Sequence, residues 1–275
     1  MNIQTALLQG HQLLEDAKIS APRLTAEVLL AHAVGSDRTW LYAHSDEQLR
    51  EVWWIHYGRY LHERLKGKPT QYITGRQEFY GREFRVTTDV LIPRPETEHS
   101  IEAALQLAPE AKTIADIGTG SGAIAVTLAL ETEVRVVATD ISERAVRLAA
   151  TNARRLAAVV EFAVCDLGSA LPSGRFDLVI SNPPYVPESD RQTVQKEVRD
   201  YEPHVALFGG VDGLSVYRRL IPEAWRLLAA GGRLILEIGW REGDAISAML
   251  GGWQNVEIRT DLASIPRVIA ARKIT

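Results

Sequence analysis

Residues 182–185 form the segment of this sequence best suited to chemistry on a planar nitrogen. They read Asn-Pro-Pro-Tyr and follow an apolar run that is typical of a strand. Pro183 and Pro184 fix the backbone and remove two N–H donors, so we expect a stiff loop whose carbonyl groups face outward. Asn182 adds a side-chain carbonyl acceptor and an amide donor. Such a loop can accept both hydrogens of an amide or aromatic NH₂ group, and Tyr185 supplies a flat wall beside that group.

An amide or aromatic amine nitrogen is a poor nucleophile because its lone pair is delocalised. When its two hydrogens are held by carbonyl groups, the nitrogen is turned toward a donor carbon and the charge that develops in the transition state is stabilised. We therefore predict that Asn182 and Pro183 are catalytic and that residues 182–185 hold the substrate. The alternative is an Asn-Pro turn without a chemical role.

A glycine-rich loop at residues 116–122 is the second candidate site. Glycines permit a tight turn and let a ligand approach the backbone N–H groups at the start of a helix. The loop fits the dinucleotide pattern G-x-G-x-x-G/A, and Asp140 follows Gly120 at about the 20-residue spacing expected of an acid that binds a ribose. Asp166, after the next apolar run, could accept a hydrogen bond from an adenine amino group, although such loop aspartates are often solvated. The pattern predicts an adenosine-containing cofactor without distinguishing NAD from S-adenosylmethionine; a glycine turn without a ligand is the other interpretation.

The elements that position these loops alternate in type from about residue 93 onward. The expected strands are 113–117, 134–139, 162–165, 178–181, 234–238, 256–260 and 268–271, and the expected helices include 142–157 and 214–229. This alternation predicts an α/β fold with a mostly parallel sheet covered on both faces. Both loops then follow strands at the carboxyl edge of the sheet, where such folds bind ligands.

The part of the chain before residue 71 has helical periodicity. A helix is expected from Pro22 to Gly35, because proline favours the first turn and glycine the end of a helix. Ser45 and Gln48 resemble a capping box for another helix that ends at Gly67. Three of the six tryptophans lie in this part, and we interpret them as core side chains, with a binding face as the alternative.

Residues 71–92 change to a strand-like period around Gly81, which predicts a hairpin. We therefore expect three parts: a helical substrate-recognition domain at 1–70, a hairpin linker at 71–92 and a catalytic domain at 93–275. Whether Glu96 and Glu98 do more than cap the following helix stays open.

Composition excludes several classes of protein. The 275 residues carry a net charge of −4 and are 46% hydrophobic, which excludes a disordered chain and disfavours broad binding to nucleic acid phosphates. No apolar stretch approaches the ~20 residues that cross a bilayer, and the N-terminus lacks the basic start of a secretory signal. Cys165 is the single cysteine, so we expect neither an internal disulfide nor a multi-cysteine zinc site, and we find no HExxH motif or other set of metal ligands. We expect a cytoplasmic monomer.

These motifs resemble class I S-adenosylmethionine-dependent methyltransferases that act on planar nitrogen, and other segments are similar to the HemK/PrmC family. The similar segments lie at 23–27, 29–32, 68–75, 93–98, 202–203, 206–213, 237–239 and 261–262. The resemblance implies a Rossmann-like sheet of seven strands and S-adenosyl-L-methionine as cofactor. It also implies methylation of N5 of the glutamine in the Gly-Gly-Gln motif of class I peptide-chain release factors, which would be the protein partners.

The motifs and the resemblance together assign two sets of site residues. Those expected to bind the cofactor are Gly118, Thr119, Gly120, Ser121, Gly122, Asp140, Asp166, Leu167 and Asn182. Those expected to hold the substrate glutamine are Asn182, Pro183, Pro184 and Tyr185. At Leu167 the family sometimes has a tryptophan against the adenine edge, so here we expect weaker stacking with an apolar contact retained.

Four alternative functions remain. Methylation of an exocyclic amine of DNA or RNA would need base flipping and a basic approach surface, and the basic excess within 50–68 is modest and typical of a solvated helix face. A glutamine of a ribosomal protein is another possible substrate. A non-catalytic adenosine-nucleotide sensor would have no need of residues 182–185. An NAD dehydrogenase would need a catalytic histidine or lysine, but His99 and His204 are the histidines after residue 93 and neither ends a predicted strand.

Overall fold

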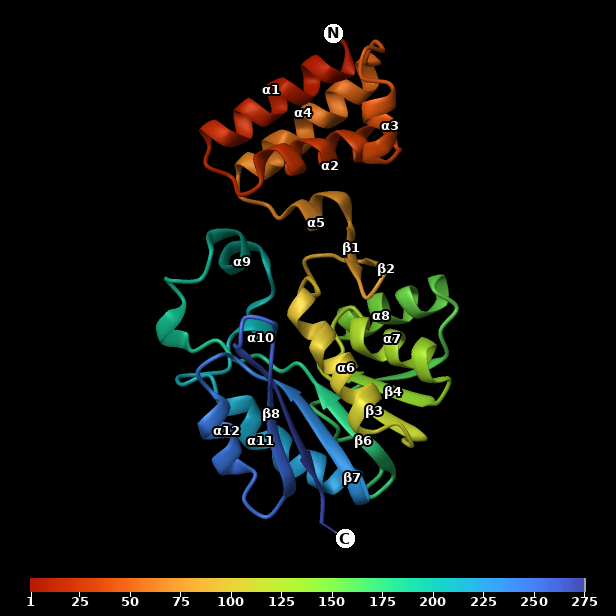
Figure 1. Ribbon diagram of the computed structural model, residues 1–275, viewed down its shortest axis with the longest axis vertical. Helices are drawn as coiled ribbons and strands as arrows, with labels where there is room; N and C mark the ends of the chain where they lie inside the picture. The colour runs from red at the N-terminus through yellow and green to blue at the C-terminus, as the bar shows by residue number, and fades with distance from the viewer. Residues whose placement is uncertain (275) are drawn as a thin grey trace. The chain divides into compact units, whose positions relative to one another are not determined.

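The structure is a computed structural model that describes residues 1–274 (Figure 1). It divides into two compact units. The helical unit comprises Met1–Arg76 together with Gln195–Tyr201, and the sheet unit comprises Gln77–Val194 together with the chain from Glu202 onward. The predicted domain boundaries at residues 70 and 92 remain predictions.

The helical unit is built from short helices around an apolar core. Its helices are α1 (Ile3–Asp16), α2 (Pro22–Val34), α3 (Arg38–Ala43), α4 (Glu51–Leu65), α5 (Thr70–Thr74) and α9 (Lys196–Tyr201). Prolines and glycines set the bounds of α2 as predicted, with Pro22 in the first turn and Gly35 at φ +79° as the cap. Trp40 and Trp54 pack against the core, as the core interpretation predicts, whereas Trp53 is not part of the core and has the Arg50 guanidinium 4.5 Å from its ring centroid.

The predicted capping box at Ser45 and Gln48 is wrong. Helix α4 begins at Glu51, because the preceding residues are extended against the start of the chain. Gln48 forms an isolated antiparallel bridge with Asn2, and its Oε1 accepts a hydrogen bond from the N-terminal amine of Met1 at 3.0 Å. A side chain used in this way cannot cap a helix.

The sheet unit contains the predicted seven-stranded sheet. Its strands are β3 (Thr113–Ile117), β4 (Arg135–Asp140), β5 (Val160–Val164), β6 (Phe176–Ser181), β7 (Leu228–Glu237), β8 (Gln254–Thr260) and β9 (Pro266–Arg272). They lie in the order β5-β4-β3-β6-β7-β9-β8, parallel except that β9 runs antiparallel to both of its neighbours. The prediction of a mostly parallel sheet is therefore confirmed.

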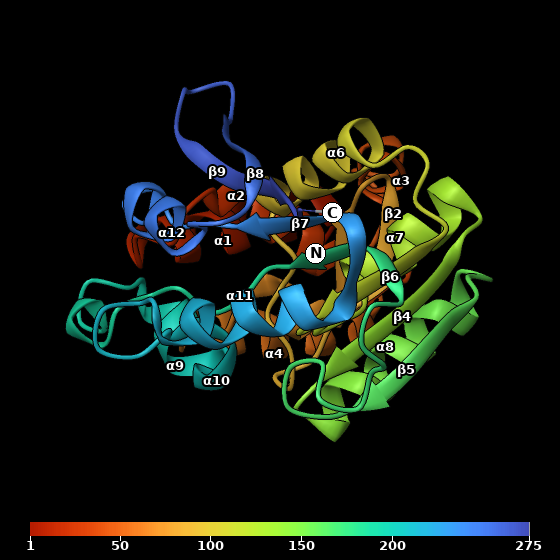
Figure 2. The same ribbon diagram turned by 90° about the horizontal axis from the view of Figure 1, so that it is seen from below.

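Helices cover both faces of this sheet, as Figure 2 shows. Those on one face are α6 (Glu98–Leu107), α7 (Ala123–Thr132) and α8 (Glu143–Arg155), and those on the other are α11 (Ser215–Leu227) and α12 (Gly243–Met249). The strands contribute apolar side chains alternately to the two cores: Ile114 packs with α6 and α7, whereas Ala115 packs with α11. Shorter turns are η1 (Pro95–Thr97), η2 (Glu188–Asp190) and α10 (His204–Leu207).

The predicted hairpin is present but shorter than expected. It consists of β1 (Arg76–Phe79) and β2 (Arg82–Arg85), while residues 71–74 belong to α5. Tyr80 and Gly81 both have positive φ, as a tight two-residue hairpin turn requires. The Tyr80 N–H donates to Glu98 Oε1 at 2.8 Å, which gives Glu98 a role beyond its own helix.

Among the described residues, no helix combines the length and the apolar character needed to cross a membrane.

Candidate active site

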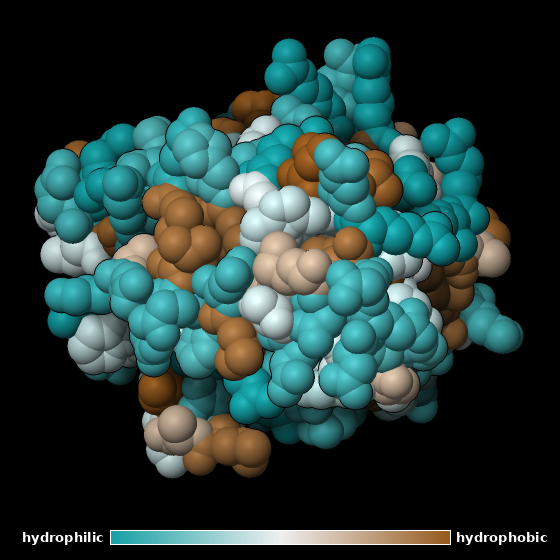
Figure 3. Space-filling model, turned by 90° about the horizontal axis from the view of Figure 1, so that it is seen from above, coloured by the Kyte–Doolittle hydropathy of each residue, from teal (hydrophilic) through white to brown (hydrophobic). Residues whose placement is uncertain are grey.

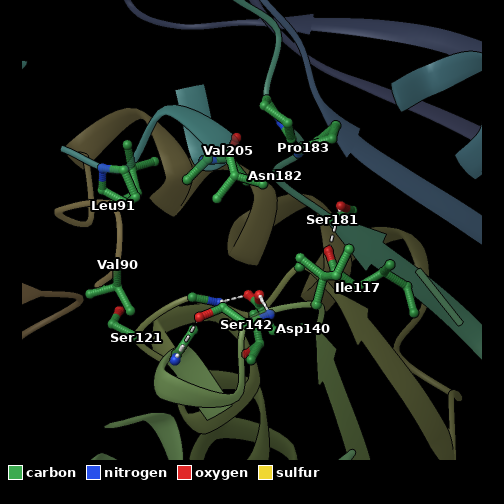
Figure 4. Close-up of a pocket in the computed structure, with 18 of the residues that line it drawn as sticks. Val90, Leu91, Ile117, Ser121, Asp140, Ser142, Ser181, Asn182, Pro183 and Val205 are labelled. Atoms are coloured by element: carbon green, nitrogen blue, oxygen red, sulfur yellow. Dashed lines mark hydrogen bonds between the residues drawn. The ribbon is translucent and has the colours of Figure 1, made fainter. Parts of the chain in front are cut away.

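A cavity lies at the carboxyl ends of β3, β4 and β6, where Ile117, Asp140 and Ser181 end their strands (Figure 4). The predicted site residues that line it are Gly118, Thr119, Gly120, Ser121, Asp140, Asp166, Leu167, Asn182, Pro183 and Pro184. The topology of the sheet thus brings both candidate loops to one cavity. Gly122 and Tyr185 are not among the residues that line it.

The glycine loop forms one wall of the cavity in a conformation that favours glycine. Gly118 and Gly120 have φ of +77° and +56°, and a Cβ atom at either position would meet nothing within 4 Å. The backbone is therefore open to a ligand at both positions. Gly122 instead caps α7, and a Cβ atom there would lie 3.0 Å from Ala149 Cβ of α8.

Asp140 holds the glycine loop against the start of α8. Its Oδ2 accepts from the Gly120 N–H at 2.9 Å, and its Oδ1 accepts from the Ser142 N–H at 2.9 Å. Burial raises the pKa of Asp140, and the backbone hydrogen bonds partly offset this rise. A carboxylate has about four acceptor positions, so Asp140 can still accept from ligand hydroxyl groups.

Asp116 lies buried beneath the same loop and was given no separate role by sequence reasoning. Thr119 Oγ1 donates to its Oδ2 at 2.6 Å, whereas its Oδ1 has no partner among the described residues. Burial, reinforced by the negative charge of Asp140, raises the pKa of Asp116 to about 7. Asp116 does not itself line the cavity, so it acts on the site through Thr119, which does.

Asp166 and Leu167 line the cavity at its rim. Asp166 Oδ2 is paired with Arg219, a rim residue that sequence reasoning missed. Leu167 has a positive φ of +51°, and its carbonyl accepts from Thr139 Oγ1 at 2.7 Å. The hydrogen bond to the buried threonine helps to hold this uncommon conformation, so the apolar side chain has a defined place in the wall.

Asn182 and Pro183 lie across the cavity from Asp140 and Ser142, with Val205 nearby (Figure 4). The Asn182 Nδ2 donates to Thr97 Oγ1 at 3.1 Å. The two candidate sites therefore face one another across a single space, with the ribose-type acid on one side and the amide-binding loop on the other.

The expectation that all carbonyls of the loop face outward is wrong for two of them. A Cβ atom on Gly209 would lie 2.6 Å from the carbonyl oxygen of Pro184, and one on Gly213 would overlap that of Tyr185. These carbonyls therefore lie against residues 209–213, a packing that tolerates no side chain at either glycine. The pairing is continued by Val186, whose N–H donates to Leu207 O at 2.9 Å. Residues 209–213 thus pack against residues 182–185, here called the proline loop, and support its backbone.

Tyr185 packs beneath the loop instead of standing in the cavity wall. Its side chain lies against the apolar core that contains Tyr217 and close to Gly239, where a Cβ atom would approach the ring within 3.1 Å. Burial raises the pKa of its hydroxyl. Its contact with the substrate remains a prediction.

The segment before α6 supplies residues that the sequence pattern did not single out. Arg94 pairs with Glu202, whose Oε2 also accepts from the Ile92 N–H at 3.2 Å. Pro93 and Pro203, next to this pair, both line the cavity. The same segment contains Glu96, whose carboxylate lies 3.7 Å from Arg267. Segments 93–98 and 202–203 are among those that carry the family resemblance, and this resemblance is the sequence signal that pointed to them.

Glu237 ends β7, the strand that pairs with β6 before Asn182, and its side chain is buried. Burial raises its pKa to about 7, while the neighbouring hydroxyl groups of Thr97 and Tyr185 and the positive charge of Arg267 act in the opposite direction. Its Oε2 has no hydrogen-bond partner among the described residues.

Known families match both parts of the chain. The model of the PrmC N-terminal domain matches residues 5–75, and that of the methyltransferase small domain matches residues 100–200. A release factor glutamine methyltransferase of Koribacter versatilis (strain Ellin345) is 46% identical over the full length of both chains. Another from Nitratidesulfovibrio vulgaris is 40% identical, with 98% of this chain and 95% of the relative covered.

Solved structures agree on the fold. The hMettl16 catalytic domain in complex with a 3′UTR hairpin has a TM-score of 0.57 at 16% identity, covering 77% of this chain and 81% of that chain. A Thermus thermophilus 16S rRNA methyltransferase in complex with AdoMet and guanosine has a TM-score of 0.50 at 19% identity, covering 72% and 49%. The fold is thus the Rossmann-like fold of class I methyltransferases, as expected.

Proposed function

This chain belongs to the release factor glutamine methyltransferases, and from that membership we propose that it methylates N5 of the glutamine in the Gly-Gly-Gln motif of class I peptide-chain release factors. The methyl donor is S-adenosylmethionine. The observation that carries the proposal is the single cavity in which Asp140 and the glycine loop face Asn182 and Pro183.

The cavity fits S-adenosylmethionine in several respects. The open backbone at Gly118 and Gly120 forms a cradle that Cβ atoms would fill, and Asp140 retains acceptor positions for ribose hydroxyls. Leu167 offers an apolar surface for an adenine ring. When bound, S-adenosylmethionine supplies an electrophilic methyl group on a positively charged sulfur.

The proline loop would bind the acceptor amide and orient it. We assign Asn182 Oδ1 and the Pro183 carbonyl as acceptors of the two amide hydrogens, because the carbonyls of Pro184 and Tyr185 lie against other backbone. Two acceptors in fixed positions turn the nitrogen lone pair toward the methyl group and stabilise the positive charge that forms on nitrogen. After methylation the amide nitrogen would lose one of its two protons to solvent, while Asn182 and Pro183 would hold it in place.

Recognition of the whole release factor falls, in this proposal, to the helical unit. Its exposed apolar side chains include Leu8, Leu13, Val52 and Ile55. Figure 3 shows such brown groups set among teal polar ones on the face it presents. A folded protein partner offers apolar side chains for such a surface, whereas a free glutamine offers almost none.

We further propose that the chain works as a cytoplasmic monomer without stable binding to nucleic acid. The charge of −4 supports the last point. Many of the arginines are paired with carboxylates, as in the pairs of Arg218 with Asp212 and of Arg219 with Asp166.

The proposal is tested by incubating the protein with radiolabelled S-adenosylmethionine and a purified class I release factor. Label should enter the protein substrate, and Asn182→Ala should slow its entry by about 10²–10³-fold while the cofactor still binds. RNA and a ribosomal protein fraction serve as competing substrates. Faster labelling of either competitor would contradict the proposed specificity.

A further inference from the structure

We propose that Thr97 is a positioning residue for Asn182: its hydroxyl group, directed by Glu237, fixes the side-chain amide of Asn182 with the carbonyl oxygen toward the cavity. This inference rests on the proposed function, because it specifies how the acceptor amide is recognised.

Three separate parts of the sheet unit converge on this arrangement. Thr97 ends η1 and is 4% exposed, Asn182 follows β6, and Glu237 ends β7 and is 2% exposed. The Asn182 Nδ2 lies 3.1 Å from Thr97 Oγ1. Glu237 is a neighbour of Thr97, and its buried Oε2 has no hydrogen-bond partner among the described residues. Thr97 also lines the cavity, so the arrangement reaches the site itself.

The chemistry of Asn182, Thr97 and Glu237 indicates which of these groups donates a hydrogen bond and which accepts one. A hydroxyl group has one proton to donate, and an ionised carboxylate can only accept. We assign the Thr97 proton to the neighbouring Glu237 carboxylate, so that Thr97 uses its lone pairs to accept from Asn182 Nδ2. The partner on Asn182 must then be its NH₂ group, which leaves Oδ1 on the side away from Thr97. The orientation of an asparagine amide is commonly assigned from such a network, and here the contact of Asn182 Nδ2 with Thr97 Oγ1 and the carboxylate beside Thr97 agree on it.

The orientation matters because the substrate is itself an NH₂ donor. With Oδ1 toward the cavity, Asn182 can accept one of the amide hydrogens of the glutamine. A flipped side chain would present its own N–H groups to those hydrogens, and the hydrogen bond would be replaced by repulsion between donors. Holding the productive orientation before the substrate arrives is the form of preorganisation on which electrostatic catalysis depends.

The environment of Glu237 determines when it can act as acceptor. The groups that face it are Thr97 and Glu96 from η1, Tyr185 from the proline loop and Arg267 from β9. A further neighbour, Tyr217 of α11, donates to the Glu237 backbone carbonyl at 2.7 Å. Burial and Glu96 favour the protonated acid, and its pKa is raised to about 7. Below that pH Glu237 can donate to Thr97, which then can donate to Asn182 Oδ1 and stabilise the flipped amide.

The test compares three variants at a constant saturating concentration of cofactor and release factor. Thr97→Val keeps the shape and removes the hydroxyl, Thr97→Ser restores the hydroxyl, and Thr127→Val removes a buried hydroxyl that has no hydrogen-bond partner in the described structure and does not line the cavity. We expect Thr97→Val to lower the single-turnover rate roughly 10- to 100-fold without changing the Kd of S-adenosylmethionine. This rate loss is somewhat smaller than the ~10²–10³-fold loss expected when a group that contacts the transition state is removed. Thr97→Ser should remain within a few-fold of wild type, and Thr127→Val should equal it.

Two further measurements separate positioning from structural support. In an Asn182→Ala background, Thr97→Val should cause no additional loss, because Thr97 acts through Asn182. In the wild type, the single-turnover rate should rise with pH through about 7, and Thr97→Val should abolish that rise. An additional loss in the Asn182→Ala background, or an unchanged pH profile, would overturn the inference.

A substrate-free measurement keeps this inference separate from the proposed function. In ¹⁵N-labelled protein without release factor, one of the two Asn182 side-chain N–H protons should exchange slowly in the wild type and rapidly in Thr97→Val. A wild type that fails to methylate release factors but shows this protection would refute the proposed function alone. Methylation by the wild type with equal rates in Thr97→Val would refute the positioning role alone.

Discussion

Gly209→Ala is the substitution whose effect on catalysis follows most directly from the backbone. A Cβ atom there would lie 2.6 Å from the carbonyl oxygen of Pro184 and closer still to that of Gly213. Real Cβ atoms essentially never approach backbone oxygens this closely, so the proline loop must shift by several tenths of an ångström. Gly209 does not have positive φ, so alanine can adopt its backbone conformation. The expected loss of activity therefore comes from the steric clash of the new Cβ atom.

The magnitude can be worked from that displacement. Misplacing a reacting group by about 1 Å can cost ~100-fold in rate, so a shift of about half that size is expected to lower the single-turnover rate by roughly one order of magnitude or more. Overpacking typically destabilises a core by about 1–3 kcal/mol. Binding of S-adenosylmethionine should change little, because the glycine loop and Asp140 lie on the other side of the cavity.

The assay measures single-turnover methyl transfer to a release factor, calorimetric binding of S-adenosylmethionine and the melting temperature. Gly251→Ala is the matched control, since its new Cβ atom would have its nearest contact at 3.7 Å and the residue does not line the cavity. We expect a rate loss with nearly unchanged cofactor affinity in Gly209→Ala and neither effect in the control. A fully active Gly209→Ala variant, or one whose cofactor affinity falls in parallel with its rate, would refute the reasoning.

Three other predictions follow from the same structure. Asp140→Ala should weaken S-adenosylmethionine binding by about 1.5–3 kcal/mol through loss of charge-assisted hydrogen bonds; titration calorimetry checks this, and tight NAD binding by the wild type would contradict the cofactor assignment. A chain that begins near Gln71 should still bind the cofactor yet lose most activity on the intact release factor, with a smaller loss on a Gly-Gly-Gln peptide; equal losses in folded protein would leave the helical unit a purely stabilising role. Burial raises the pKa of Glu237 to about 7 in the folded protein, so the folded state holds this proton more tightly than the unfolded state does. The contribution of Glu237 to folding stability is therefore fully present below its unfolded-state pKa and is lost as pH rises through 7. Glu237→Gln should therefore raise the melting temperature at pH 8 more than at pH 5, and an equal change at both pH values would argue against a buried ionisable carboxylate.

The sheet was predictable from sequence because helices of a different period separate most of its strands. The predicted ends of helices and strands were wrong where pairing between strands overrode the local preference for helix. Residues 214–229 were expected to be helical throughout, but α11 ends at Leu227 because Leu228 pairs with Phe176 in the sheet. The alternation of apolar residues carries no information about that pairing.

The site was predictable to the extent that its residues lie together in the sequence. The glycine loop and residues 182–185 are each recognisable by composition, and the rule for parallel sheets places them at one edge. The contacts of Glu202 with Ile92 and Arg94 and that of Asn182 with Thr97 join segments about 85 to 110 residues apart. No local pattern predicts such contacts, and the inward packing of Tyr185 was missed for the same reason.

The most direct measurement of the proposed activity is tandem mass spectrometry of a release factor after incubation with the protein and S-adenosylmethionine. We predict one added methyl group, located on the side-chain nitrogen of the glutamine in the Gly-Gly-Gln motif, and none when Asn182→Ala replaces the wild type for the same brief reaction time. A methyl group on any other residue, or an unmodified release factor beside methylated RNA, would contradict the proposal.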